Sequence, residues 1–195
     1  MEIKNFIMTD ESQVLAQLEP HLNKPLNPRR TPAWVAGRKV PADQRMPVIL
    51  KEPGGVYRRF LHVRGLPSAR EMPQLTKDID VHNQERAIMP LAGFEYAVLG
   101  QKPSDPYMAA SPAQTDQVLW VAGTYSLKPG SIEPDSFYPK LVGAGRGLGR
   151  ANRWEPFFID VEDAQCWLEP FVHRRIEPEG RPFGFFHFDK GDVPA

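Results

Sequence analysis

The sequence predicts a single α+β domain with a mainly antiparallel sheet and three to four short helices. Its 195 residues are enough for one domain with its own core. With 41% hydrophobic and 25% charged residues, the composition is typical of a folded globular protein. The 21 prolines keep helices short, which argues against an all-helical bundle. We therefore expect residues 1–195 to form one domain of short helices and strands.

The N-terminal third contains the clearest elements. A helix is predicted from Asp10 to Glu19, because Asp10 can cap its first turn and Pro20 ends it. Residues 20–47 are rich in proline and basic side chains and are predicted to be irregular. A hairpin follows, in which the strands 46–52 and 56–63 flank a Pro-Gly-Gly turn.

The rest of the chain predicts shorter elements that alternate between the two types. High β-propensity predicts strands over 94–99, 118–125, 157–159 and 183–188. Capping residues and proline stops predict helices or helical turns over 78–89, after Ser111-Pro112, over 137–141 and over 160–169. The two types together give the α+β class.

The charges are unevenly distributed although the formal net charge is zero. Between residues 20 and 70 there are eleven basic residues and two acidic ones, whereas from residue 154 onward there are nine acidic and four basic residues. Such asymmetry favours either a basic surface for a polyanion or two halves that neutralise each other in the fold. Arginine outnumbers lysine by fifteen to nine, which suits phosphate recognition because guanidinium binds phosphate through two parallel hydrogen bonds.

A glycine- and arginine-rich run between Lys140 and Trp154 is the most unusual local feature. Its glycines allow the backbone to approach a ligand closely, its cations attract phosphates, and its tryptophan can stack on a base. The residues concerned are Gly143, Gly145, Arg146, Gly147, Gly149, Arg150, Arg153 and Trp154. We predict contact with RNA or single-stranded nucleic acid here, with the track extended by Arg29, Arg30, Arg58 and Arg59 and with Tyr57 or Trp34 as further stacking residues. A solvated surface loop is the alternative interpretation.

Two families have glycine patterns similar to this run. The spacing Gly143-x-x-x-Gly147-x-Gly149 is similar to that of short-chain dehydrogenases, but Pro156 prevents the long helix that must follow, so we reject this similarity. The run also resembles the glycine-rich loop of repeat-associated (RAMP-type) RNA-binding proteins of CRISPR ribonucleoproteins, although that loop ends in a glycine–aromatic step where this chain has Arg153-Trp154. The second resemblance implies a ferredoxin-like domain that binds RNA.

Two other function classes stay open. Asp78, Asp80 and His82 alternate along the chain, so in a strand they would share one side and could hold a divalent metal for phosphodiester hydrolysis. In a helix, Asp78 or Asp80 would simply cap the first turn. The other class is a protein-interaction module, such as an inhibitor, an immunity-type protein or a phage-like assembly protein, which the neutral total charge favours.

Several classes are excluded by what the sequence lacks. The single cysteine, Cys166, excludes an internal disulfide and a multi-cysteine zinc site. No apolar run approaches the length needed to cross a bilayer, and the acidic start does not resemble a secretory leader. Because no complete catalytic set is present, we expect a cytoplasmic binding protein without cofactor rather than an enzyme.

Overall fold

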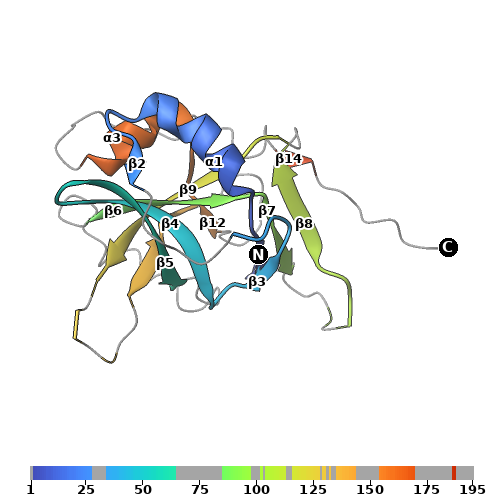
Figure 1. The fold of residues 1–195 in the computed structure, drawn as a ribbon. Helices are drawn as coiled ribbons and strands as arrows, with labels where there is room; N and C mark the ends of the chain where they lie inside the picture. Colours follow the sequence, from blue (N-terminus) through green and yellow to red (C-terminus); the bar gives the residue numbers. More distant parts are fainter. Residues whose placement is uncertain are drawn as a thin grey trace.

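The computed structural model describes residues 2–27, 34–64, 85–97, 102, 104–112, 116–127, 129–130, 132, 135–143, 154–169 and 186–187. Strands make up most of this part of the chain, and two short helices lie together on one side (Figure 1). The described strands are β1 (Glu2–Ile7), β2 (Leu26–Asn27), β3 (Lys39–Pro41), β4 (Arg45–Glu52), β5 (Gly55–Val63), β6 (Arg86–Leu91), β7 (Gly93–Ala97), β8 (Met108–Pro112), β9 (Leu119–Ser126), β10 (Ser136–Pro139), β11 (Leu141–Gly143), β12 (Trp154–Pro156), β13 (Phe158–Ile159) and β14 (Phe186–His187). The described helices are α1 (Glu11–Leu18) and α3 (Ala164–Leu168), with 3₁₀ turns η1 (Glu19–His21) and η2 (Val161–Asp163).

Five of the strands close into a barrel. Neighbouring strands pair in the order β10, β5, β4, β6 and β9, and β9 pairs in turn with β10, which completes the ring. Every pair in the ring is antiparallel except β5 with β10, which is parallel. Outside the ring, β13 pairs with β9 and β2 pairs with β5.

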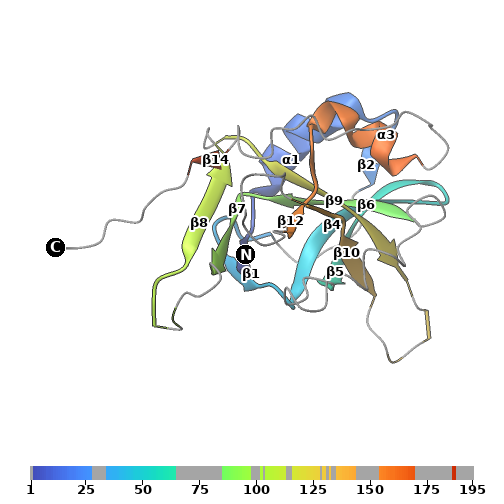
Figure 2. The ribbon, with the colours of Figure 1, turned by 180° about the vertical axis from the view of Figure 1, so that it is seen from behind.

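A second sheet lies beside the barrel and has the order β14, β8, β7, β1 and β3. Only Ala92 separates β6 from β7, so one stretch of chain passes from the barrel into this sheet. Figures 1 and 2 show β7 and β8 next to the barrel, with α1 and α3 across its upper side.

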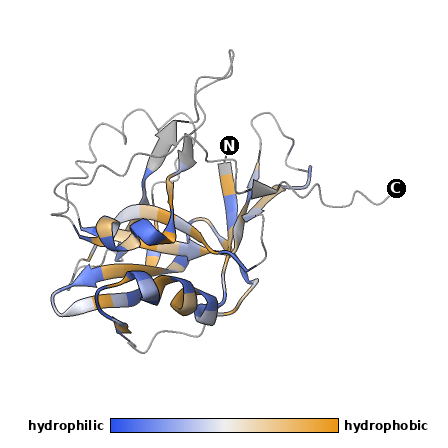
Figure 3. Cartoon of the chain, turned by 90° about the horizontal axis from the view of Figure 1, so that it is seen from above, coloured by the Kyte–Doolittle hydropathy of each residue, from blue (hydrophilic) through white to orange (hydrophobic). Residues whose placement is uncertain are grey.

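The two faces of the barrel strands enter two different hydrophobic clusters. Alternate residues point inward and fill the barrel; they include Met46, Val48, Leu50, Leu61, Met89, Val121 and Phe137. The residues between them point outward, and Ile49, Ile88 and Ala122 are covered by Val14 and Leu18 of α1 and by α3. Figure 3 shows hydrophobic colour along much of these strands, because both sides are covered while successive side chains alternate between the two clusters. This period of two is what a strand between two layers requires.

Two predictions about local structure are confirmed. The helix predicted at Asp10–Glu19 is α1, and the Asp10 side chain accepts a 2.7 Å hydrogen bond from the Ser12 backbone N–H as its cap. The predicted hairpin is β4–β5, whose turn contains Gly54 and Gly55 at positive φ.

The prediction of an α+β, ferredoxin-like fold with three to four helices is wrong, because a closed barrel of strands forms the centre of the protein. Three segments predicted to be helical contain strands instead: β6 overlaps the end of 78–89, β8 includes Ser111-Pro112, and β10 overlaps 137–141. Short segments with buried residues do not reveal their type by periodicity alone, and pairing with distant strands decides it. With the ferredoxin-like fold, the ground for RNA binding and CRISPR association drawn from the RAMP-type resemblance is also lost.

Candidate functional site

A row of polar side chains crosses the outside of the barrel over four adjacent strands. Tyr138 of β10 lies opposite Thr124 of β9, and Thr124 lies opposite Arg86 of β6. On the other side of Tyr138, the Arg64 backbone N–H donates to the Phe137 carbonyl at 2.8 Å, which continues the β5–β10 register and places Arg64 beside Tyr138. Neighbouring residues such as Phe137 belong to the barrel interior, so this row lies on the outer side of the barrel, where Thr124 is buried, Arg86 and Tyr138 are half-buried and Arg64 is exposed.

Lys140 adds a third cation one step along the surface. Its backbone N–H donates to the Ala122 carbonyl at 2.9 Å, and its carbonyl accepts from the Phe157 backbone N–H at 2.8 Å. We call Arg64, Arg86 and Lys140, with the aromatic residues Tyr138 and Trp167, the cationic face. The strands β9 and β10 that carry it are seen from behind in Figure 2.

Trp167 of α3 is fixed at the centre of this face. Its indole N–H donates to the Ala87 carbonyl at 3.0 Å and to the Gly123 carbonyl at 3.2 Å. The Arg86 Cζ atom lies 5.0 Å from the centre of the Trp167 ring, and the Lys140 Nζ atom lies 5.4 Å from it. Lys140 Nζ is also 4.7 Å from the centre of the Phe157 ring. These distances are typical of cation–π contacts, so both cations are positioned by aromatic rings.

The positive charge of the face is not neutralised within the described residues. Neither Arg86 nor Lys140 has a carboxylate partner in this part of the chain, and Arg86 Nε is buried without a hydrogen-bond partner. Burial lowers the pKa of Arg86. Burial, and then the charge of Arg86, lower the pKa of Lys140. Nearby, Lys51 pairs with Glu169 at 3.2 Å.

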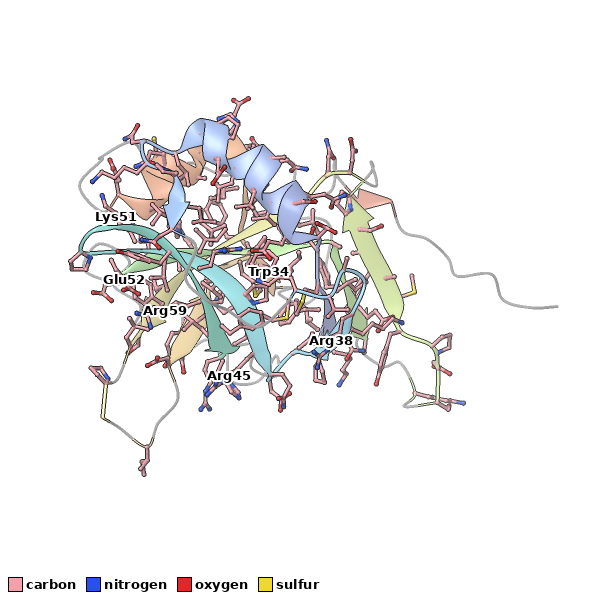
Figure 4. All side chains as sticks on the ribbon, viewed as in Figure 1. Trp34, Arg38, Arg45, Lys51, Glu52 and Arg59 are labelled. Atoms are coloured by element: carbon pink, nitrogen blue, oxygen red, sulfur yellow. The ribbon has the colours of Figure 1, made fainter. Side chains whose placement is uncertain are left out.

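The face continues toward one end of the barrel. His62 lies between Ser136 of β10 and Arg45 of β4 in the strand register, and Arg45 is exposed. Figure 4 shows Arg45 at the lower edge of the barrel, well separated from Arg38. The Nδ1 atom of His62 is buried and has no hydrogen-bond partner among the described residues.

The glycine- and arginine-rich run begins at this face. Gly143 pairs with Trp154 in the two-stranded ribbon β11–β12, so the two ends of the run lie side by side. Lys140 lies three residues before Gly143, at the base of the ribbon. Figure 2 shows β12 on the same side as β9 and β10. The arginines of the run, Arg146, Arg150 and Arg153, and the glycines Gly145, Gly147 and Gly149 lie outside the described residues.

Two arginines of the predicted track already have carboxylate partners. Arg58 is buried beneath α1 and pairs with Glu11. Arg59 pairs with Glu52 at one end of the barrel, as labelled in Figure 4, and this contact raises the pKa of Arg59. The role of these two arginines in nucleic-acid binding stays a prediction, and we do not include them in the proposed interface.

The remaining predicted residues are distributed as follows. Tyr57 is buried in the barrel, and Trp34 is half-buried against both hydrophobic clusters. Trp154 is in β12 opposite Gly143, but its side chain is not described. The residues outside the described part are Arg29, Arg30, Asp78, Asp80 and His82. Metal-dependent hydrolysis by the last three therefore stays untested.

Sequence reasoning missed Arg64, Arg86 and Tyr138 as site residues, whereas it counted Lys140 among the cations of the run. The segments predicted to be helical include Arg86 and Tyr138, and a strand register cannot be read in a helix. The alternation of Tyr138 and Lys140 around Pro139 was the available signal, since alternate residues of a strand share a face.

Within the described ranges, no group of three or more metal-ligating side chains is present. No helix in the described part of the chain is long and apolar enough to span a membrane.

These features define a small barrel protein with an aromatic, cationic outer face. No family model matches the chain, and no curated protein matches it. Among solved structures it is similar to a phage-related protein from Bordetella bronchiseptica, with 12% identity over 87% of this chain and 83% of that one and a TM-score of 0.54. A second protein from that bacterium is 10% identical over 85% and 87% of the two chains, with a TM-score of 0.49. At this identity the first similarity shows the fold alone.

Proposed function

We propose that the protein binds single-stranded nucleic acid on the cationic face without catalysing a reaction. The carrying observation is that three cations, Arg64, Arg86 and Lys140, lie within two strands of the half-buried Tyr138 and have no acidic partner among the described residues. Cations neutralise phosphates, and aromatic rings stack on bases of any sequence. A cytoplasmic location is part of the same proposal.

The spacing within the row supports a strand-like ligand. In the register Arg64 lies beside Tyr138, and Arg86 lies two strands further along the ring, across Thr124. The Arg64 cation suits a phosphate, and the neighbouring phenol ring of Tyr138 suits a base. An unpaired strand offers its bases for stacking, whereas a duplex keeps them inside.

The strand pairing of the barrel gives independent support. The five barrel strands can be numbered 1 to 5 in the order β6, β9, β10, β4 and β5. Strand 1 then pairs with strands 2 and 4, strand 2 pairs with strand 3, and strand 4 pairs with strand 5. The third and fifth strands then form the parallel pair. This pairing pattern resembles that of the OB barrel with its chain order cyclically permuted. In OB barrels the second and third strands carry the oligonucleotide-binding face, and here they correspond to β9 and β10.

The test is direct binding of fluorescent oligonucleotides measured by anisotropy. We expect oligo-dT or oligo-U to bind more tightly than a DNA duplex of the same length, and the two single strands distinguish DNA from RNA as the preferred source. Arg64→Ala should weaken binding about fivefold or more by removing a phosphate contact. Arg38→Ala is the matched control, because it removes an exposed arginine that directly precedes β3 at the edge of the second sheet.

Two results would overturn the proposal. One is the absence of measurable single-strand binding at low salt; the other is an equal loss of affinity in Arg64→Ala and Arg38→Ala. Either result would make the protein-interaction module the better hypothesis.

A further inference from the structure

Arg86 and Lys140 form a distinct pair within the cationic face, because both lie against the same indole ring. Arg86 Cζ is 5.0 Å and Lys140 Nζ is 5.4 Å from the centre of the Trp167 ring. Trp167 is only 3% exposed and holds its position through two hydrogen bonds to barrel carbonyls. The two cationic groups are therefore placed before any ligand arrives, which lowers the entropic cost of binding one.

The pair carries two positive charges that nothing in the described part of the chain offsets. The charge of Arg86 itself lowers the pKa of Lys140, which shows that the two groups repel each other. The acidic residues closest in sequence to Trp167 and Arg86 have other partners: Glu169 accepts from Lys51, and Glu85 interacts with Tyr125. In addition, Arg86 Nε is a buried donor without an acceptor among the described residues. An anion bound between the two cationic groups would offset their repulsion.

We propose that Arg86 and Lys140 bind a phosphate monoester group, with Trp167 and Phe157 as the aromatic walls that position them. A monoester carries a charge of about −1.5 to −2 at neutral pH, which matches two unneutralised cations, whereas each internal phosphodiester carries a single charge. Arginine and lysine also supply several donors for the three terminal oxygens of such a group. In combination with the proposed function, on which this inference rests, the group is the terminal phosphate of a strand. The other source of the same chemistry is a free phosphate or nucleotide.

The experiment compares three probes on the intact protein: a 5′-phosphorylated dT octamer, the same octamer with a 5′-hydroxyl, and inorganic phosphate alone. Anisotropy gives the affinity of the octamers, and thermal melting with added phosphate reports binding of the free anion. We expect the terminal phosphate to tighten octamer binding about tenfold, the effect of a few charge-assisted hydrogen bonds. This preference should disappear in Arg86→Gln and in Lys140→Gln and persist in Arg38→Gln.

The outcomes separate this inference from the proposed function. Equal affinity for both octamers, without stabilisation by inorganic phosphate, overturns the terminal-phosphate site and leaves single-strand binding intact. Stabilisation by phosphate without binding of either octamer supports the site and overturns the proposed function. If a glutamine variant does not fold, the two octamers on the wild-type protein still decide the question.

Discussion

The salt dependence of binding tests the cationic face quantitatively. Each phosphate neutralised on a single strand contributes about 0.7 to the slope of log affinity against log salt concentration. Arg64, Arg86 and Lys140 are the three cations of the face and have no acidic partner among the described residues. If each contacts one phosphate, together they account for a slope of about 2. Glutamine at any one position should reduce the slope by about 0.7 and at all three by about 2.

The assay is anisotropy of a labelled dT oligonucleotide between 50 and 300 mM NaCl, roughly the range over which such slopes are measured. Far-UV circular dichroism of each variant verifies that the fold is retained. Arg38→Gln should leave the slope unchanged, because Arg38 is exposed beside β3 of the second sheet and not on the barrel strands. A triple variant with the wild-type slope would refute the assignment of phosphate contacts to this face, even if the protein binds single strands.

Three other predictions concern charge and packing. Glu11→Gln removes the carboxylate partner of the buried Arg58 guanidinium and should reduce the free energy of unfolding in urea by about 1 kcal/mol. The expected value is small because Glu11 is 36% exposed. Oligonucleotide affinity should stay unchanged. Gly123→Ala places a Cβ atom 2.4 Å from the Tyr138 carbonyl oxygen and 2.5 Å from the Phe137 ring, so it should destabilise the barrel by about 2 kcal/mol; unchanged urea melts would contradict the described packing. Lys140→Met should stabilise the protein at neutral pH, because burial lowers the pKa of Lys140 in the folded state and its charge therefore destabilises the fold. This destabilisation is fully present below the pKa of Lys140 in the folded protein and decreases as the pH rises from there toward 10.5, the pKa of an ordinary lysine. The stabilisation gained by the substitution should therefore shrink over the same pH range. Urea melts at a series of pH values from neutral to alkaline measure the trend, and a gain that grows with pH would be the opposite of this expectation.

The sequence predicts local elements of this fold better than its architecture. The helix at Asp10 and the hairpin around Gly54-Gly55 are specified by neighbouring residues, through a cap and a turn. Strand β10 is different, because its four residues, Ser136 to Pro139, are too few to reveal their type by periodicity, and they pair with the distant strand β5 as well as with β9. The closure of the barrel depends on such pairings between distant segments. Local propensity therefore could not reveal it.

The candidate site follows the same division. The unusual run between residues 140 and 154 is visible in the sequence, and the structure adds that its flanking strands pair at Gly143 and Trp154. Arg86 could not be joined to this run from sequence, since 54 residues separate it from Lys140 and only the register of β6, β9 and β10 brings them together. In addition, the prediction of a helix over 78–89 gave Arg86 no strand partner, so its position opposite Thr124 could not be inferred.

A count of basic residues along a segment of sequence predicts a binding surface wrongly when those residues form ion pairs within the folded protein. In the basic N-terminal third, Arg58 pairs with Glu11, Arg59 with Glu52 and Lys39 with Glu95, so these side chains hold the fold together. The cationic face is instead formed by residues on or next to β5, β6 and β10, together with Trp167 of α3, which lie in separate parts of the sequence. Within the described residues of α3, Trp167 rather than a carboxylate lies against Arg86 and Lys140, and Glu169 just after α3 pairs with Lys51. An aromatic residue at this position fixes the cations without cancelling their charge, which is the condition for attracting a phosphate from solution.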